Sequence, residues 1–403
     1  MKLLHTSDWH VGKVLKGLDR TDEHRLVLSE IVSIAQTQQV DVVLVVGDLF
    51  ETSLPTPEAQ KLVWQTLMAL KATGAEVIVI AGNHDSPSLF EAMTSVFGAL
   101  DIAMVGRVRR PTEGGIIRFN AKSTGEPVEV ALLPFVSQRG IVTSLHLLGE
   151  DMAAAQLNQT YASRVNKLIT ALTNELSPSA VRIFAAHAHV NGGKLGGGER
   201  QAQSIFDYGI EPSAFPNTMH YVALGHLHRR QLVPGPCPIH YCGSPIQVDF
   251  GEQADNKTVL IVEASPTTPA RITEIALTSP RTLRIVQGTE AELEQLTGTF
   301  GEALLRIRVV DTKNSVGLAD RVRAWHPNAL EVRIDPTVET ATISPGSRPD
   351  TKTPAELFSQ FLLHINVDDE RLDGLFNELH DEVTSAHHDF LLSEASSAAG
   401  GAS

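Results

Sequence analysis

Five short apolar runs in the first part of this chain each lead into a polar side chain that can bind a metal ion. The runs are Lys2–Thr6, Asp41–Val46, Glu76–Ala81, Val181–Ala186 and Tyr221–Leu224, and they lead into Asp8, Asp48, Asn83, His187 and His226. Apolar runs of about four to eight residues bounded by turn residues are typical of buried strands. Ligands of open α/β sheets bind beyond the carboxyl ends of the strands. The pattern therefore predicts an α/β fold in which these side chains meet at one edge of a sheet.

The rest of this region also alternates between apolar runs and amphipathic segments, as α/β domains do. Further strands are expected at Val128–Leu133, Ile239–Tyr241 and Thr258–Glu263, and helices at Asp22–Gln38 and Pro57–Thr73. A third helix should begin after Ser86, because Ser86 is a favourable N-cap and Pro87 suits the first helical position. Segments 111–127 and 191–203 are rich in glycine and polar residues, so we expect surface loops there.

A length of 403 residues exceeds the usual size of one domain. We place the main domain at 1–278, because Ser279-Pro280 indicates a boundary and a small α/β unit follows at 279–337. Its expected strands are Thr282–Gln287, Ala303–Val310 and Ala329–Asp335. Two helices should lie between them, and a capping box of Thr289 and Glu292 should open the first.

The C-terminal part has a different composition. A stretch rich in proline, glycine, serine and threonine marks 338–354 as a linker. Residues 355–392 carry two amphipathic helical stripes: Leu357, Phe358, Phe361, Leu362 and Ile365, then Leu372, Leu375, Phe376 and Leu379. The stripes are either the core of a third unit or a surface that binds a partner helix in a groove. Residues 393–403 are expected to be disordered.

Charge and cysteine content restrict the function classes. The net charge is −14, which weakens a nucleic-acid hypothesis because phosphate binding leaves a basic footprint. Two divalent cations would offset part of that deficit locally. Cys237 and Cys242 are too few for a disulfide framework, so we expect buried free thiols in a reducing cytoplasm. The chain shows neither a signal peptide nor an apolar run long enough to span a membrane, which takes about 20 residues.

The polar motifs that follow the runs share one chemistry. They are Asp8-Trp9-His10, Gly47-Asp48, Gly82-Asn83-His84-Asp85, His187 and Gly225-His226-Leu227-His228. Each alone is a weak signal, since a histidine or a Gly-Asp turn at a strand end is common. Together they supply oxygen and imidazole donors without thiolate, which favours Mn²⁺, Fe²⁺ or Zn²⁺ over Ca²⁺. The set predicts a site with two metal ions for phosphoester hydrolysis.

The order of these motifs resembles the calcineurin-like metallophosphoesterase superfamily. Within it, the stretches 5–12 and 47–55 are similar to nuclease subunits that process DNA ends with an SMC-like ATPase. The resemblance implies a four-layer α/β/β/α sandwich with mixed sheets, a small α/β capping domain that binds DNA, and a helical tail that binds the ATPase. It also implies Mn²⁺-dependent 3′–5′ exonuclease activity on double-stranded ends and endonuclease activity on single strands and hairpins. The resemblance further implies that two copies of this chain form a dimer within a heterotetramer. It also implies that this assembly lies in the cytoplasm, on the nucleoid.

Residue roles follow from the same resemblance. Asp8, His10 and His228 match ligands of the first metal, Asn83, His187 and His226 match ligands of the second, and Asp48 matches the bridging carboxylate. His84 matches the catalytic histidine, which stabilises the reacting phosphate or protonates the leaving oxygen. Asp85 either accepts a proton from the His84 ring or is an ordinary carboxylate at a helix N-terminus.

Several sequence features leave alternatives open. His189 either faces substrate or lies in a solvated loop. Arg107, Arg109 and Arg110, with Arg229 and Arg230, are either DNA contacts or a solvated basic face. A phosphatase or cyclic-nucleotide phosphodiesterase of the same superfamily competes as a function. The sequence argues against a protein phosphatase, because Glu51 and Asp85 stand where that group has other residues. A non-enzymatic scaffold would not need the complete ligand set.

Overall fold

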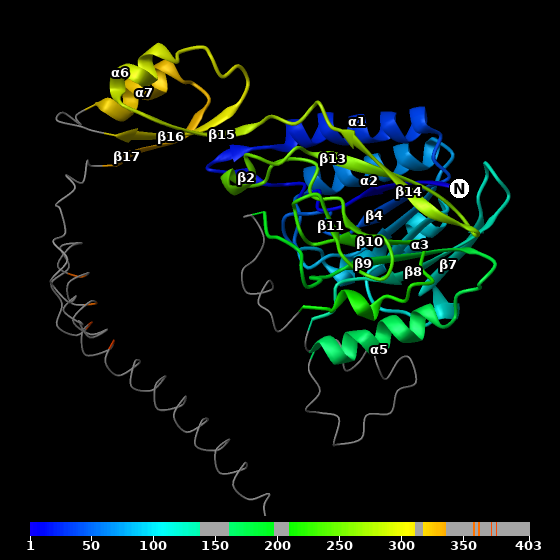
Figure 1. Cartoon of the computed structure of the whole chain (residues 1–403). Coiled ribbons are helices and arrows are strands. Elements are labelled where there is room, and N and C mark those ends of the chain that lie inside the picture. Colours follow the sequence, from blue (N-terminus) through cyan, green and yellow to red (C-terminus); the bar gives the residue numbers. More distant parts are fainter. Residues whose placement is uncertain are drawn as a thin grey trace, which may run out of the picture. The chain divides into compact units, whose positions relative to one another are not determined.

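Two six-stranded mixed sheets, packed face to face, form the centre of the computed structural model (Figure 1). The structure describes residues 1–137, 161–196, 209–310 and 317–335, together with Phe358, Leu362, Leu372 and Phe376. Met1–Thr337 form one unit and Val338–Ser403 a second.

The first sheet has the order β14-β13-β1-β4-β5-β6. Its strands are β14 (Thr268–Ala276), β13 (Thr258–Ser265), β1 (Lys2–Thr6), β4 (Val42–Val46), β5 (Glu76–Ile80) and β6 (Ile102–Val105). The four strands from β1 to β6 run parallel, and β13 and β14 close one side as antiparallel neighbours. Strand β4 is buried along its whole length, which explains why its sequence is a continuous apolar run.

The second sheet has the order β11-β12-β10-β9-β8-β7. Its strands are β11 (Gln231–Val233), β12 (Ile239–Tyr241), β10 (Tyr221–Gly225), β9 (Val181–His187), β8 (Pro127–Leu133) and β7 (Ile116–Asn120). The four inner strands are parallel and both edge strands are antiparallel to them. One apolar cluster, to which Leu3, Val46, Val130 and Tyr221 belong, fills the space between the two sheets.

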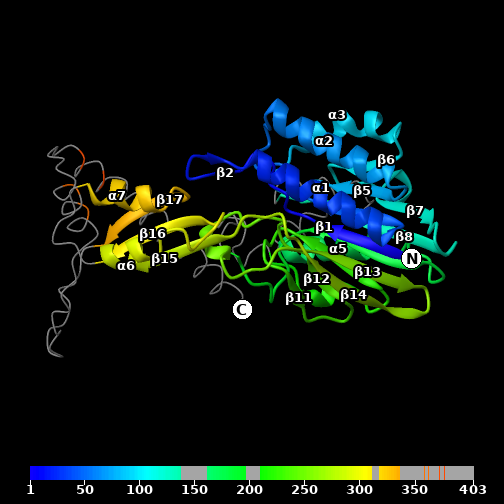
Figure 2. The ribbon, with the colours of Figure 1, turned by 90° about the horizontal axis from the view of Figure 1, so that it is seen from above.

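Helices cover the outer faces of both sheets. Helices α1 (Thr21–Gln38), α2 (Pro57–Ala72) and α3 (Pro87–Gly98) lie on the first sheet, and α5 (Tyr161–Thr173) lies on the second (Figure 1). The layers are therefore helix, sheet, sheet and helix, which confirms the expected four-layer sandwich. A short hairpin of β2 (Val14–Leu15) and β3 (Leu18–Asp19) follows β1 in the chain and projects beyond the end of α1 (Figure 2). The described residues also form the single-turn 3₁₀ helices η1 (Pro111–Glu113), η5 (Pro212–Ala214) and η6 (Phe250–Glu252).

The expected strands and helices of this region are confirmed to within two residues at each end, and the Ser86 side chain caps α3 as expected. The prediction of a loop at 111–127 was wrong, because β7 lies inside that segment and pairs with β8 through a tight turn. Its flanking glycines and alternating exposure conceal a short edge strand. Strands β6 and β14 and helix α5 were not predicted. Residues 191–196 have no helix or strand, and 197–203 lie outside the described residues.

A separate three-stranded parallel sheet follows residue 279; we call this region the cap. Its elements are β15 (Leu283–Gly288), α6 (Glu290–Gln295), β16 (Leu304–Val310), α7 (Leu318–Trp325) and β17 (Ala329–Asp335). The sheet order is β15-β16-β17, with an apolar cluster of its own around Leu293, Ile307 and Val322. The predicted strands, the two helices and the Thr289 capping box are confirmed.

Little of the second unit is described, and the linker and residues 393–403 lie outside the described residues. The four residues that are described are helical. The rings of Phe358 and Phe376 stack with their centroids 4.2 Å apart and their planes at 8°, and Leu362 is buried. The two predicted stripes therefore touch each other. Among the described residues, no helix is long and apolar enough to cross a membrane. Cys242 is buried, Cys237 is half-buried, and both are free thiols.

Candidate metal centre

All seven predicted ligands come together at the carboxyl ends of the parallel strands. The first sheet contributes Asp8 and His10 after β1, Asp48 after β4 and Asn83 after β5; the second contributes His187 at the end of β9 and His226 and His228 after β10. The expectation of a single sheet edge was therefore wrong. The two sheets stack with these strand ends on the same side of the molecule. The Asp8 carboxylate, after β1, therefore accepts a hydrogen bond from the His226 amide, after β10, at 3.0 Å.

The backbone is strained where ligands leave the strands. Asp8, His10, Asp48 and His226 all have positive φ angles, of 53°, 50°, 51° and 105°. Residues with a Cβ atom rarely adopt this region, and each such residue costs about 1–3 kcal/mol unless its surroundings compensate. Main-chain bonds from Asp8 to Gly47 at 2.9 Å and from His10 to Asp48 at 3.0 Å hold the two loops together. The strain is therefore found where the chain presents a ligand.

The glycines before the ligands are required by close approach. A Cβ atom on Gly82 would lie within 3.0 Å of the Asp48 carboxylate, and one on Gly225 would lie as close to the Val46 carbonyl. Real Cβ atoms essentially never show such contacts. The Gly-His-Leu-His motif therefore begins with glycine because the two sheets meet there, and the Gly-Asn-His-Asp motif does so because the loops after the neighbouring strands β4 and β5 lie in contact.

We call the ligand set of Asp8, His10 and His228 the first half of the centre. One donor atom from each of these residues lies within 4.8 Å of the others. His10 Nε2 and His228 Nε2 face each other at 3.0 Å. Behind them, Glu51 lies 3.1 Å from His10 Nδ1, and Glu252 lies 3.0 Å from His228 Nδ1. Both imidazoles thus have a carboxylate on the side away from the centre.

We call the set of Asn83, His187 and His226 the second half. The Asn83 Oδ1 atom lies 2.9 Å from His187 Nε2 and 2.8 Å from His226 Nδ1, so three atoms that can each coordinate a metal ion converge. His187 Nδ1 donates to the Val46 carbonyl at 2.9 Å, which directs Nε2 toward Asn83. The ring of Phe135 lies nearly parallel to that of His226, with centroids 6.4 Å apart.

Asp48 lies between the two halves, as expected for a bridging carboxylate. Its Oδ2 atom is 3.4 Å from His187 Nε2 and 3.8 Å from His10 Nε2, and its Oδ1 accepts the His84 amide at 2.8 Å. Buried oxygen and imidazole donors that converge in this way match the requirements of a divalent metal. The residues present therefore fit a pair of metal ions.

The electrostatics of the site are dominated by burial and by these contacts. Burial raises the pKa of Asp8 to about 6, although His187 and His228 oppose the change. Burial also acts to raise the pKa of Asp48, but the neighbouring imidazoles, above all His187, hold it well below its usual range. Burial alone would lower the pKa of His187, yet Asp48 raises it to about 9. Asp48 and His187 thus favour each other's charged form across a distance of 3.4 Å.

His84 and Asp85 lie beside the ligands with different partners. The His84 ring stands edge-on to His10, with centroids 4.7 Å apart, and its Nδ1 donates to the Glu51 carbonyl at 2.7 Å. The Asp85 carboxylate instead accepts main-chain amides of Gly82 at 2.8 Å, Phe50 at 3.1 Å and Leu49 at 3.2 Å. The interpretation of Asp85 as the partner of the His84 ring was therefore wrong. Its bonds join the loops that carry Asp48 and Asn83, so Asp85 is a positioning residue.

The sequence did not point to several residues that support the centre. Glu51 follows the Gly-Asp motif closely, and that proximity was an available signal. Glu252 and Phe135 lie far from every motif in the sequence, so no local pattern marks them. Burial would raise the pKa values of Glu51 and Glu252, but their histidine and lysine partners lower both to about 2. Both carboxylates are therefore ionised.

The basic clusters and His189 contribute less to the centre. Arg109 pairs with Glu91 at 2.8 Å and Arg230 with Glu274 at 2.8 Å. Arg110 pairs with Glu113 and Arg229 with Asp255. Arg107 donates a hydrogen bond to the Ser88 hydroxyl. These partners favour a solvated, paired face over a dedicated phosphate site. The half-buried His189 ring lies beside the second half, 6.4 Å from that of His226.

Fold and site together define a metal-dependent phosphodiesterase. A sequence profile of the calcineurin-like phosphoesterases matches residues 1–230, more than half of the chain, and the chain belongs to this family. A second profile, the type 5 capsule protein repressor C-terminal domain, matches residues 279–365.

Several proteins named as nuclease subunits are similar to this chain over most of its length. The chain is similar to the D-type subunit of the nuclease SbcCD from Bacillus subtilis (strain 168), with 31% identity over 342 residues, 83% of this chain and 85% of that protein. The corresponding protein of Rhodobacter capsulatus is 27% identical over 370 residues, 88% of this chain and 89% of its own length. The corresponding protein of Escherichia coli (strain K12) is 30% identical over 270 residues, 66% of this chain and 65% of its own length.

Proposed function

We propose that this chain is the nuclease subunit of an SbcCD-type complex, with an SbcC-type SMC-like ATPase as its partner. Its activities would be 3′–5′ exonucleolytic cleavage of double-stranded DNA ends and endonucleolytic cleavage of single strands and hairpins, both dependent on Mn²⁺. The observation that carries the proposal is the pair of ligand sets on either side of Asp48, with His84 beside it. The relatives that are named as nuclease subunits support the substrate.

Two divalent cations supply charge neutralisation at the scissile phosphate and an activated water. Mn²⁺ is favoured over Ca²⁺ because the donors mix imidazole with carboxylate and amide oxygens. Asp48 holds the two halves in register, since its carboxylate lies between them. Asp85 keeps the loops of Asp48 and Asn83 in place through three main-chain amides.

His84 is the proposed catalytic residue. Its Nδ1–H donates to the Glu51 carbonyl at 2.7 Å, which fixes the ring and leaves the chemistry at Nε2. A protonated Nε2 can stabilise the negative charge that develops on the phosphate or donate its proton to the leaving oxygen. The His84 ring stands edge-on to His10, and one of its nitrogens lies within 4.8 Å of donor atoms of His10 and Asp48, so His84 lies at the centre itself.

The proposal is tested by comparing substrates. Purified chain with Mn²⁺ should cleave linear duplex DNA, with and without the ATPase partner, far better than cyclic nucleotides or aryl phosphates. His84→Ala should lose cleavage by about 100-fold or more while retaining both metals, because general acid–base catalysis contributes about 10²–10⁴-fold. Preference for a small phosphoester would support the phosphatase alternative. Unchanged cleavage by the variant would exclude the catalytic role of His84.

The proposed partners engage other surfaces. We assign residues 355–392 to the ATPase contact, because their stripes are amphipathic and follow the linker 338–354. A chain lacking 355–392 should retain Mn²⁺-dependent cleavage of short DNA and lose co-purification with the ATPase. Persistent co-purification would instead place the contact on Met1–Thr337.

A homodimer within a heterotetramer is proposed through the helices between Pro57 and Leu100. Helices α2 and α3 expose Met68 and Val96, and Leu100 follows directly, each with more than two fifths of its surface accessible. The cap at 279–337 is the proposed DNA-binding domain, supported by its separate sheet and apolar cluster. We propose a cytoplasmic, nucleoid-associated location, since the proposed substrate is chromosomal DNA.

A further inference from the structure

A buried ion pair lies directly behind one of the metal ligands. Glu252 is fully buried, and its Oε2 atom lies 2.6 Å from the Nζ atom of Lys257, which is also buried. The other carboxylate oxygen, Oε1, lies 3.0 Å from His228 Nδ1. Because a carboxylate can only accept, His228 donates from Nδ1. The nitrogen that faces His10, Nε2, is then the one that carries the lone pair.

The Glu252 carboxylate is itself held from several sides. Its Oε2 accepts the main-chain amide of Val248 at 3.2 Å and the hydroxyl of Ser244 at 3.5 Å, in addition to the ammonium group. Lys257 Nζ also donates to the main-chain carbonyl of His228 at 3.1 Å. The pair therefore fixes both the ring and the backbone of this ligand.

We propose that Glu252 is a positioning residue for the first half of the metal centre and that Lys257 holds it in place. The inference rests on the two-metal site of the proposed function. A carboxylate behind an imidazole ligand fixes its tautomer and orientation and makes it a stronger donor, and loss of such a partner costs about 10–100-fold in metal affinity. Glu252 meets that geometry at His228.

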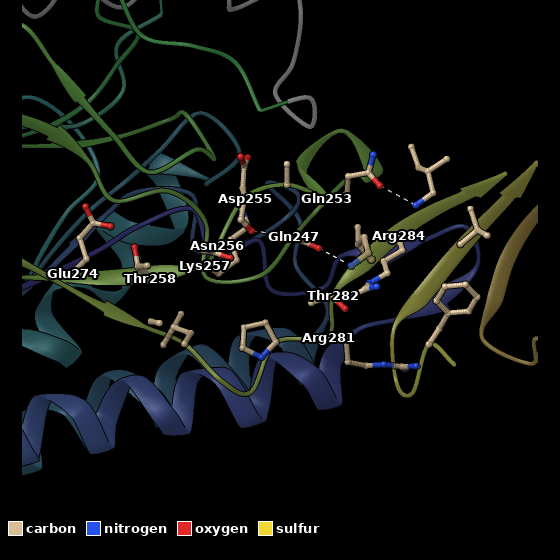
Figure 3. A pocket seen from close by; sticks show the side chains of 18 of the residues that line it. Gln247, Gln253, Asp255, Asn256, Lys257, Thr258, Glu274, Arg281, Thr282 and Arg284 are labelled. Atoms are coloured by element: carbon tan, nitrogen blue, oxygen red, sulfur yellow. Dashed lines mark hydrogen bonds between the residues drawn. The ribbon is translucent and has the colours of Figure 1, made fainter. Parts of the chain in front are cut away.

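The same segment also holds the cap (Figure 3). Gln247 Nε2 donates to the Glu252 carbonyl at 2.9 Å. Its Oε1 accepts the amide of Leu283, the first residue of β15, at 2.6 Å. Gln253 Oε1 accepts the amide of Ile285 at 2.9 Å. The cap strand is therefore bonded to the short segment that carries Glu252, so the cap steadies the support of His228.

A purely structural role for the ion pair makes a different prediction. Buried ion pairs contribute little net stability, and their joint replacement by apolar side chains of similar volume is often neutral. Glu252→Met combined with Lys257→Met removes both charges and keeps the packing volume. Folding of the metal-free protein should therefore change less than when either charge is removed alone, and the Mn²⁺ affinity of the folded double variant reports on positioning.

The experiment uses the full chain and Mn²⁺ alone. Calorimetric titration gives the two affinities, and electron paramagnetic resonance distinguishes a coupled pair of ions from a single ion. The double variant should bind one Mn²⁺ as the wild type does and the other about 10–100-fold more weakly. Glu252→Gln keeps an oxygen acceptor in a side chain of the same shape, so it should lose less Mn²⁺ affinity than the double variant does.

The matched control is Glu129→Gln. Glu129 is also a buried carboxylate in an ion pair, with Arg118 at 3.0 Å, but it lies on β8 away from the centre. This variant should bind both ions normally. The inference would be overturned if the double variant had wild-type Mn²⁺ affinities or lost affinity equally at both sites. If the double variant does not fold, an unchanged Mn²⁺ affinity in Glu252→Gln would overturn it. A wild-type chain that binds no Mn²⁺ would instead refute the proposed function.

Discussion

The two halves of the metal centre use similar ligands but are supported in different ways. Behind the first half stand carboxylates, with Glu51 at His10 Nδ1 and Glu252 at His228 Nδ1. Behind the second half stand a main-chain carbonyl, at His187, and the ring of Phe135. Of the four histidine ligands, His228 is the one whose Nδ1 is hydrogen-bonded to a carboxylate, and such an imidazole is a more basic ligand than one that donates to a neutral carbonyl. The first half should therefore hold its cation more tightly.

The supports also differ in where they originate. Val46 is part of β4, so the sheet itself orients His187. Glu252 lies in η6, 24 residues from His228 in the chain, and depends on Lys257 and on the segment bonded to the cap. Support from the sheet should resist substitution, whereas support from side chains can be removed one contact at a time. The halves can thus be separated experimentally.

The largest effect should come from the residue that both halves share. Asp48→Ala removes the carboxylate that faces a histidine of each ligand set, so the metal content by elemental analysis should fall close to zero. The matched control is Asp101→Ala. Asp101 has nearly the same φ angle, 53° against 51°, but is exposed and lies in a turn. Metal retained by the Asp48 variant would show that each half binds without a bridge.

Most of the centre could be predicted from the sequence, because ligands at strand ends are local features. The seven ligands and His84 each follow an apolar run, and the order of the motifs resembles a known superfamily. The contribution of two sheets could not be predicted, since no local pattern encodes which sheet a strand joins. The same holds for Glu252 and Phe135, whose contacts form only when segments distant in sequence pack together.

Failures elsewhere in the fold have equally physical causes. Strand β7 resembles a loop in sequence because one face of this short edge strand is solvated and glycines flank it, Gly114 and Gly115 before it and Gly125 after it. Asp85 was given a possible catalytic role because it neighbours His84 in sequence. Neighbours on a tight turn point in different directions, and the Asp85 carboxylate points to backbone amides. Sequence adjacency is therefore a weak guide to contact at such turns.

An intermediate effect should appear in the second half when its aromatic support is removed. Phe135→Leu loses the ring that lies against His226 and edge-on to His187, with centroids 6.4 Å away in both cases. Aromatic pairs contribute about 0.5–1.5 kcal/mol, so the affinity of one Mn²⁺ should fall about three- to tenfold. Phe119→Leu, on β7, is the matched control. If Phe135→Leu weakened Mn²⁺ binding in the first half instead, Phe135 would not be the support of the second half.

The smallest effect should come from the bond between the cap and the first half. Gln247→Leu keeps the volume but removes the bridge from Leu283 to the Glu252 carbonyl, so Glu252 is held less firmly. These bonds act on His228 only through Glu252, so a small part of the roughly 0.5–1.5 kcal/mol of a hydrogen bond should reach the metal site, and the tighter Mn²⁺ should weaken by about twofold. Gln253→Leu loses a cap contact, to Ile285, that does not involve Glu252. If calorimetry gives equal losses for both variants, the cap acts on the centre as a whole and not through Glu252. A loss in Gln247→Leu alone would show that the cap reaches His228 through this one carboxylate.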